Sequence, residues 1–171
     1  MELVGNALCL DFANTVNSRL RPVRDSLDSE SSYVDWLRRV GLDGSTPSLV
    51  EARRLREVIY ATFSAIAAGR TPRATDLARI AEAYGHAVTH ATLVPVDGHY
   101  DLTWPAPDPL WSVAASAGTL LLNGPLNRVG ECPGCGWLFL DTSRNGTRRW
   151  CSMATCGSRD KMARYHARPP R

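Results

Sequence analysis

The chain has 171 residues, of which 44% are hydrophobic, which suits one domain of ordinary size with a real core plus a small appendage. The formal net charge is only +3, and the composition is not that of a low-complexity or disordered chain. No apolar run approaches the roughly 18 residues that span a bilayer, and the N-terminus lacks the basic and then apolar pattern of a signal peptide. We therefore expect a cytoplasmic protein with no membrane partner.

The first predicted element is a helix over residues 3–20. Leu8, Phe12 and Val16 recur at spacings of four, which places them on one face of a helix. A short strand over residues 7–12 is the alternative.

Three polar residues, Asp11, Asn14 and Thr15, border this apolar stripe. In one interpretation Asp11 and Asn14, together with Arg56, line a pocket for a small-molecule effector. In the other, these polar groups cap and tie neighbouring elements. The second is favoured, because buried polar groups are usually satisfied within the fold.

Further helices follow along the chain. Ser31 or Ser32 opens a short helix that ends at Gly41. Three longer helices share a capping residue followed by proline at the first helical position. Their starts are Thr46-Pro47, Thr71-Pro72 and Asp108-Pro109. Their expected ends are Ala68 before Gly69, Tyr84-Gly85 and Asn123.

A β-hairpin is predicted between the last two of these helices. Its strands, 86–96 and 99–104, flank Asp97-Gly98, a dipeptide typical of tight hairpin turns. His86, His90 and His99 lie in this stretch, but no acidic ligand accompanies them and strand geometry would scatter their rings. A second metal site is therefore not favoured.

The C-terminal part contains four of the five cysteines, spaced as Cys132-x2-Cys135, fifteen intervening residues, then Cys151-x4-Cys156. Four thiolates satisfy a tetrahedral Zn(II) ion and leave no position open for water or substrate. A disulfide pair or four unrelated thiols are the alternatives, but clustering within 25 positions favours the metal. The sequence predicts one structural zinc ion per chain.

The segments around these cysteines predict a hairpin and a helix. Residues 137–141 and 148–150 read as strands joined at Asn145-Gly146. A helix over 158–168 follows, with Ser158 as its N-cap.

Charge is distributed unevenly along the chain. Residues 128–171 hold nine Lys or Arg against three acids, so this part is about +6 and the preceding part about −3. In the last helix we expect Met162 and Tyr165 to pack inward. A basic segment of this kind indicates an anionic partner such as DNA. The candidate nucleic-acid contacts are Arg144, Arg148, Arg149, Arg159, Lys161, Arg164 and Arg168.

These motifs carry a resemblance. The finger motif consists of Cys132-x2-Cys135-Gly-Trp-Leu-Phe-Leu-Asp-Thr-Ser143-Arg-Asn-Gly146, Arg148-Arg149-Trp150-Cys151-Ser-Met153 and Cys156-Gly-Ser-Arg159-Asp-Lys161. It resembles the CGNR-type zinc finger, except that Ser158 stands where that family has Asn. Upstream, Leu8-Cys-Leu-Asp11-Phe-Ala-Asn14-Thr15-Val16, Val34-Asp-Trp36-Leu37 and Arg53-Arg-Leu55-Arg56-Glu-Val-Ile-Tyr60 resemble the ABATE domain that accompanies this finger. The resemblance implies a stress-linked bacterial transcription regulator.

We therefore predict an α+β, mostly helical fold. An ABATE-like helical domain with a small β-hairpin spans residues 1–125, and a treble-clef-like zinc finger, a zinc-bound hairpin plus helix, spans 126–171. The expected function is DNA-binding transcription regulation, with the finger contacting nucleic acid and the N-terminal domain sensing an effector or forming a homodimer.

The alternative is a small-molecule or protein-interaction module that does not bind DNA. In it the finger is a brace whose arginines pair with acids of the larger domain. No nucleophile with its base, phosphate loop or open metal site is evident, so we do not expect an enzyme.

Overall fold

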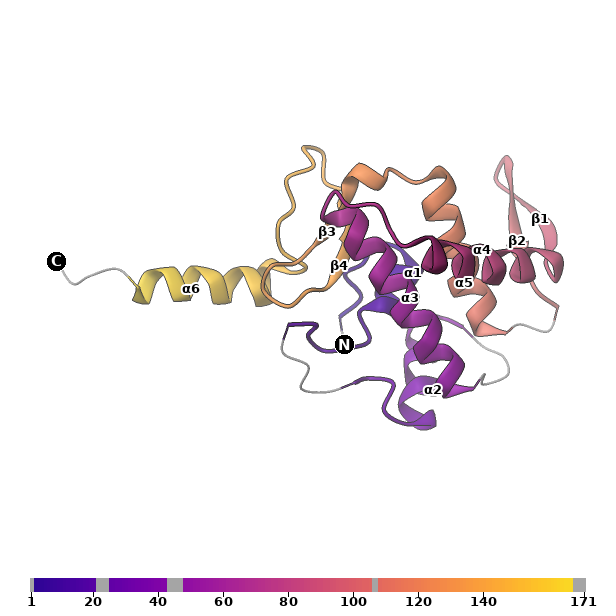
Figure 1. Cartoon of the computed structure of the whole chain (residues 1–171), viewed down its shortest axis with the longest axis horizontal. Coiled ribbons are helices and arrows are strands. Elements are labelled where there is room, and N and C mark those ends of the chain that lie inside the picture. Colours follow the sequence, from indigo (N-terminus) through magenta and orange to yellow (C-terminus); the bar gives the residue numbers. More distant parts are fainter. Residues whose placement is uncertain (1, 21–24, 43–47, 106–107, 168–171) are drawn as a thin grey trace.

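The computed structural model describes residues 2–20, 25–42, 48–105 and 108–167. The fold is α+β and mostly helical, as predicted (Figure 1). The helices are α1 (Leu8–Ala13), α2 (Glu30–Arg39), α3 (Leu49–Ala67), α4 (Ala74–Thr89), α5 (Pro109–Asn123) and α6 (Ser158–His166). The strands form two antiparallel hairpins, β1 (Thr92–Val96) with β2 (His99–Thr103), and β3 (Val129–Glu131) with β4 (Leu138–Leu140).

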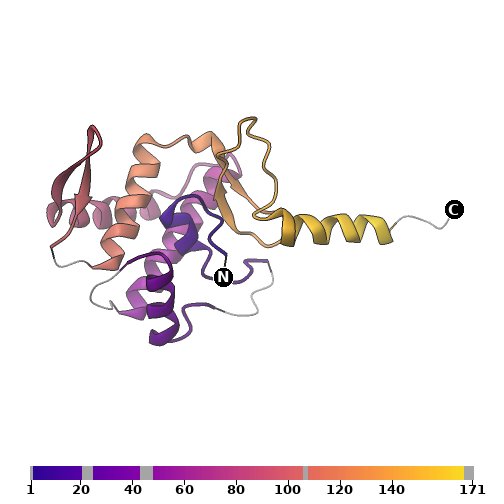
Figure 2. The ribbon, with the colours of Figure 1, turned by 180° about the vertical axis from the view of Figure 1, so that it is seen from behind.

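The core surrounds α1, which packs against α3, α5 and β4. Phe12 and Trp36 bring their ring centroids to 5.2 Å and join α1 to α2. Seen from behind, α6 extends away from this body (Figure 2).

Helix α1 is much shorter than the predicted helix over residues 3–20, and the strand alternative is wrong. Asn6, with φ of 56°, precedes the helix in a conformation that an α-helix cannot contain. After Ala13, the Thr15 hydroxyl donates to the Phe12 carbonyl, and Val16 pairs with Asp25 in an isolated β-bridge. Local hydrogen bonds therefore end the helix before the apolar periodicity does.

Helix α2 begins slightly earlier than expected. Ser29 is its N-cap and forms a capping box with Ser32, and Gly41 follows its C-terminus with φ of 72°. The Thr46-Pro47 start lies outside the described residues, but α3 ends before Gly69 as predicted.

Helix α4 starts at Ala74, not at Thr71-Pro72, and runs through Gly85 to Thr89. Tertiary packing explains the extension: Tyr84 lies against Gly118 of α5, where an added Cβ would come within 2.3 Å of the tyrosine ring. The predicted first strand therefore begins at Thr92 instead of residue 86.

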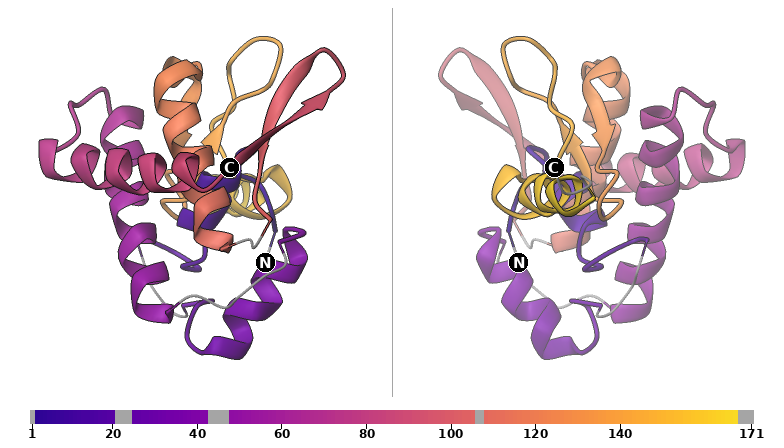
Figure 3. Two further views of the ribbon diagram at one scale, coloured as in Figure 1. Left: turned by 90° about the vertical axis from the view of Figure 1, so that its right-hand side faces the viewer. Right: turned by 90° about the vertical axis from the view of Figure 1, so that its left-hand side faces the viewer.

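The β1–β2 hairpin turns at Asp97 and Gly98, both with positive φ, as the sequence predicted. It stands out from the helical body (Figure 3), at the end of the molecule opposite α6 (Figure 1). The predicted cap of α5 is also confirmed, because the Asp108 carboxylate accepts the Leu110 N–H at 2.8 Å.

The predicted pairing of 137–141 with 148–150 is wrong: β4 pairs with β3. The Cys132–Cys135 loop forms the turn between them, since the Cys132 N–H donates to the Trp137 carbonyl at 2.8 Å. The segment before Trp150 turns back because the Asp141 carboxylate accepts the N–H groups of Ser143 and Arg148.

The start and packing of α6 also differ from expectation. A wide helical turn over Met153–Gly157 precedes it, so Ser158 lies inside the helical segment and donates to the Met153 carbonyl instead of capping. Met162 and Tyr165 are 55% and 70% exposed, not packed inward. No described element covers α6, which points away from the body (Figures 1 and 3).

Candidate metal centre

The four cysteines meet at one buried point. Cys132 and Cys135 come from the turn of the β3–β4 hairpin, and Cys151 and Cys156 from the approach to α6. Their sulfur atoms all lie within 4.8 Å of one another, and none forms a disulfide. Four sulfurs bound tetrahedrally at about 2.3 Å from Zn(II) would lie about 3.8 Å apart. The donor set and its spacing fit one structural zinc ion.

The electrostatics of the cluster favour a thiolate. Cys135 and Cys151 donate their S–H groups toward the Cys132 sulfur, which lowers the pKa of Cys132. Donation to that thiolate raises the pKa of Cys135 to about 12. Zinc binding supplies the positive charge that keeps coordinating thiols deprotonated.

The turn between the first two cysteines touches the N-terminal part of the chain. The backbone N–H of Arg19 donates to the Cys135 carbonyl at 2.7 Å, and the Trp137 indole N–H donates to the Val16 carbonyl at 2.6 Å. Gly136 has φ of 74°, and a Cβ there would meet the Arg19 Cβ at 2.6 Å. The metal-binding turn is therefore held directly against the segment that follows α1.

Helix α3 holds the other side of this turn. Glu131, next to Cys132, accepts hydrogen bonds from the Tyr60 hydroxyl at 3.0 Å and the Ser64 hydroxyl at 2.6 Å. Burial and the neighbouring Glu131 carboxylate raise the pKa of Tyr60 to about 12, so the phenol stays a donor. This contact fixes β3 on the helical body.

Arg148, a predicted nucleic-acid contact, is used inside the fold. Its guanidinium donates to the carbonyl oxygens of Val4 at 2.7 Å, Cys151 at 2.6 Å and Trp150 at 3.2 Å, and stacks over the Phe139 ring. These contacts join the N-terminal segment to the metal loop, so the Arg148 side chain has a structural role.

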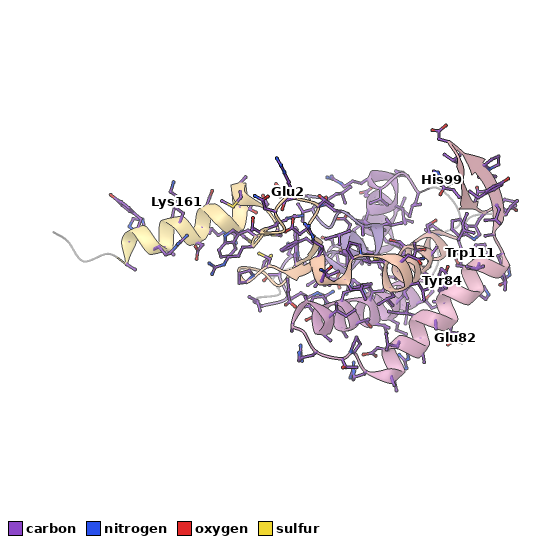
Figure 4. The ribbon with its side chains drawn as sticks, turned by 90° about the horizontal axis from the view of Figure 1, so that it is seen from above. Glu2, Glu82, Tyr84, His99, Trp111 and Lys161 are labelled. Atoms are coloured by element: carbon purple, nitrogen blue, oxygen red, sulfur yellow. The ribbon has the colours of Figure 1, made fainter. Side chains whose placement is uncertain are left out.

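The other predicted cations are placed differently. Arg144, Arg159 and Lys161 are exposed and make no hydrogen bond or ion pair with any described residue. The guanidinium of Arg149 lies 4.9 Å from the Trp150 ring centroid. Figure 4 shows Lys161 on α6, clear of the body.

The remaining two predicted cations are Arg164 and Arg168. Arg164 pairs with Asp160 at 2.7 Å, and Arg168 lies outside the described residues. Between the metal turn and α6, Arg149, Trp150 and Arg159 line one cavity of about 320 Å³. The structure thus brings together two cations that are ten positions apart in the sequence.

The predicted effector residues have partners within the fold. Asp11 is buried, which raises its pKa, and it accepts the Gly5 N–H at 2.8 Å. Asn14 bonds to the backbone of β4 at Leu138, and Arg56 donates to Asp25 at 2.8 Å. The structure uses these residues to tie elements together, as the second interpretation of the sequence had it.

Sequence reasoning missed Glu131 and Asp141 as organising groups of the finger. Asp141 precedes Thr-Ser, a composition typical of turns in which a carboxylate accepts nearby backbone N–H groups. That signal was available, whereas the partners of Glu131 come from a distant helix and leave no local pattern.

The comparisons with known proteins agree with this geometry. A family model named ABATE and described as "Putative stress-induced transcription regulator" matches residues 6–124, and a CGNR zinc finger model matches residues 128–169. A search of curated proteins gives no match. In the described residues, no helix is both long and apolar enough to cross a membrane. The chain belongs to the ABATE family and carries a CGNR zinc finger with a four-cysteine zinc site.

Proposed function

We propose that the chain is a DNA-binding transcription regulator whose finger contacts the phosphate backbone. One observation carries the proposal: Arg149 and Arg159, neither paired with an acid in the described residues, line one cavity beside the zinc site. Guanidinium groups bind phosphate oxygens through parallel N–H bonds. The family description supports the same role.

The alternative is that the finger is only a brace. In the described residues the finger docks through backbone carbonyls, Asn14 and Glu131, and none of its Arg or Lys side chains pairs with an acid of the N-terminal part. Docking of the finger on the N-terminal part therefore leaves the side chains of Arg149, Arg159 and Lys161 available for contacts with DNA. Bracing and DNA contact are compatible in one finger.

Helix α6 has a suitable shape for the major groove. Its nine residues are about 13 Å long at about 1.5 Å per residue, and no described element covers it. The major groove is about 12 Å wide and admits an α-helix. We assign Arg159 and Lys161 to phosphate contacts, which give affinity without sequence information.

The test is binding of the zinc-loaded chain to a labelled random-sequence duplex across a salt series. Each cation that neutralises a phosphate contributes about 0.9 to the slope of log affinity against log salt. Arg149→Gln, Arg159→Gln and Lys161→Gln should each lower the slope by about that amount, and Arg54→Gln, an exposed arginine of α3, should not. No binding at low salt, or unchanged slopes in all three finger variants, would reject the proposal.

A homodimer in the cytoplasm completes the proposal, since regulators often read paired half-sites. The register places Leu93 and Tyr100 on one face of the β1–β2 hairpin, where they are 63% and 68% exposed. Two-stranded hairpins are marginal alone, and a second copy would cover this face. Sedimentation should show a dimer that Tyr100→Lys dissociates. A monomeric wild-type chain would exclude the dimer.

We assign no catalysis to the chain.

A further inference from the structure

Two histidines lie side by side at the C-terminal end of α4. His86 is in the last turn of the helix, His90 is its C-cap, and both residues are exposed. Residues four apart are neighbours on a helix surface, and the two ring centroids are 4.4 Å apart. The expectation that strand geometry would scatter these rings is therefore wrong for His86 and His90, because α4 continues past Gly85 and carries both of them.

The hydrogen bond that His90 makes leaves its other ring nitrogen available to a ligand. The Nδ1 atom lies 2.8 Å from the His86 carbonyl oxygen, which can only accept, so we assign the proton to Nδ1. The Nε2 atom is then the unprotonated nitrogen, and it has no hydrogen-bond partner among the described residues. Histidines that bind metals usually donate their second ring N–H to a carbonyl or carboxylate in this way.

Helix α5 supports the His90 ring from the side. The Trp111 ring stacks on it, with centroids 4.8 Å apart and planes at 24°, and lies 5.8 Å from the His86 ring. An aromatic wall and a backbone hydrogen bond thus hold one imidazole in place before an ion arrives, which reduces the entropy that binding costs. Figure 4 shows Trp111 at the end of the molecule opposite α6, so this pair is separate from the four-cysteine site.

The electrostatics at this end of α4 favour a cation. The last carbonyl groups of a helix carry partial negative charge, and a cation near them is stabilised. The N-terminus of α5 lies next to Trp111 and is the positive end of a second helix dipole. It is capped by the Asp108 carboxylate, which adds a full negative charge there.

We propose that His86 and His90 together bind one divalent transition-metal ion through their imidazole nitrogens. Imidazole suits Zn(II), Cu(II) and Ni(II), whereas Mg(II) and Ca(II) prefer oxygen ligands. Two nitrogens bound at about 2.1 Å to one ion lie roughly 3 Å apart. The His86 ring nitrogens make no hydrogen bond among the described residues, so the ring can turn one of them beside Nε2 of His90.

This ion differs in character from the one in the four-cysteine site. Only two protein ligands hold it, and water fills the remaining positions. The ion therefore exchanges with solution, and its occupancy follows the free concentration of the metal. The four-thiolate site, in contrast, is closed by protein and retains its ion.

Calorimetric titration of the zinc-loaded chain with Ni(II) tests the site. One Ni(II) should bind per chain while elemental analysis shows that the zinc is retained, and an excess of Mg(II) should not compete. His86→Gln and His90→Gln should each lose about tenfold in affinity, because each removes one of two ligands. The matched control is His99→Gln, an exposed histidine of β2 that lies 3.5 Å from Asp101 and should leave the affinity unchanged.

A variant with altered spacing separates chelation from the mere presence of two imidazoles. Val88 is 39% exposed on the same helix, but residues two apart do not face each other. Val88→His combined with His90→Gln keeps the number of histidines and should bind Ni(II) no more tightly than His90→Gln alone.

Four results would overturn the site. They are the absence of Ni(II) binding to the zinc-loaded wild type, unchanged affinity in both His86→Gln and His90→Gln, an equal loss in His99→Gln, and recovery of wild-type affinity in the variant with altered spacing. Circular dichroism of each variant checks that α4 is intact. No DNA is involved, so the outcome is independent of the proposed function.

Discussion

Asn14, which directly follows α1, pairs with the backbone of Leu138 in β4 as a neighbouring strand would. Its side-chain amide donates to the Leu138 carbonyl and accepts the Leu138 N–H, both at 2.8 Å. The two residues are separated by 124 positions and both are buried. A side chain from the ABATE segment thus satisfies the backbone of the strand that leads out of the metal turn.

Asn14→Ala should destabilise the chain by about 3 kcal/mol. It leaves a buried N–H and a buried C=O of Leu138 without partners, and each such group costs about 1–3 kcal/mol. Urea unfolding measures the change. The control is Asn145→Ala at an exposed loop position, expected within about 0.5 kcal/mol of wild type. Equal stability of the two variants would show that water replaces Asn14 without loss.

Replacing Cys135 or Cys151 by Ser should reduce bound zinc well below one ion per chain. Hydroxyl groups are poor substitutes for thiolates at a four-thiolate site, and the metal contributes folding energy to such small modules. Zinc is measured by elemental analysis after dialysis. Cys9→Ala is the matched control, because Cys9 is buried outside the cluster. Stoichiometric zinc in both ligand variants would refute the ligand assignment.

Asp25→Asn should lower the free energy of unfolding by about 2 kcal/mol at pH 7. The buried Arg56 guanidinium then loses its bidentate, charge-assisted hydrogen bonds to the Asp25 carboxylate. Burial of Asp25 opposes its charge and is the largest single effect, but the hydrogen bonds from Arg56 and Leu27 and the charges of Arg56 and Arg53 together outweigh it and lower the pKa of Asp25. The carboxylate therefore stabilises the fold fully above its unfolded pKa of about 3.9, and this contribution is lost as the pH falls through the lower folded pKa.

Urea unfolding of wild type and Asp25→Asn from pH 7 to pH 3 checks this sign. The stability difference should stay constant above about pH 4 and shrink below it. A difference that is the same at pH 3 and pH 7 would mean that the charge of Asp25 contributes nothing.

Two glycine substitutions should act in opposite directions. Gly118→Ala pushes a methyl group into the Tyr84 ring and should destabilise by about 1–3 kcal/mol. Gly85→Ala meets open space inside α4 and should stabilise by about 0.5–1 kcal/mol. Thermal unfolding of both variants measures the pair. Destabilisation by Gly85→Ala would contradict the helical conformation at residue 85.

The parts of the structure that the sequence predicted well depend on neighbouring residues. The cysteine spacing, the Asp108 cap and the Asp97-Gly98 turn each express chemistry within a few positions. Such features are readable because the groups that interact are close along the chain.

The errors come from interactions between distant residues. Gly85 appeared to end α4, yet the contact of Tyr84 with Gly118 carries the helix past it. The partner of β4 was wrong because Arg148 and Asp141 fold the expected return strand into a loop.

The same limit applies to the candidate nucleic-acid contacts. Sequence alone cannot distinguish Arg148, which bonds the Val4 and Cys151 carbonyls, from its exposed neighbour Arg149. Nor does it show that residues 20 and 39 line one cavity together with residues of the finger.

The contacts of β4 and Arg148 have a consequence for the order of folding. The Leu140 N–H donates to the Gly5 carbonyl, Arg148 bonds Val4, and Asn14 bonds Leu138, so an early-synthesised segment completes a late-synthesised hairpin. At about 5–20 residues per second, residues 4–14 leave the ribosome many seconds before their partners exist. During synthesis the metal site can therefore close only after residues 4–14 have left the ribosome. Nascent chains paused before Cys151 would expose the apolar face of α1 to chaperones.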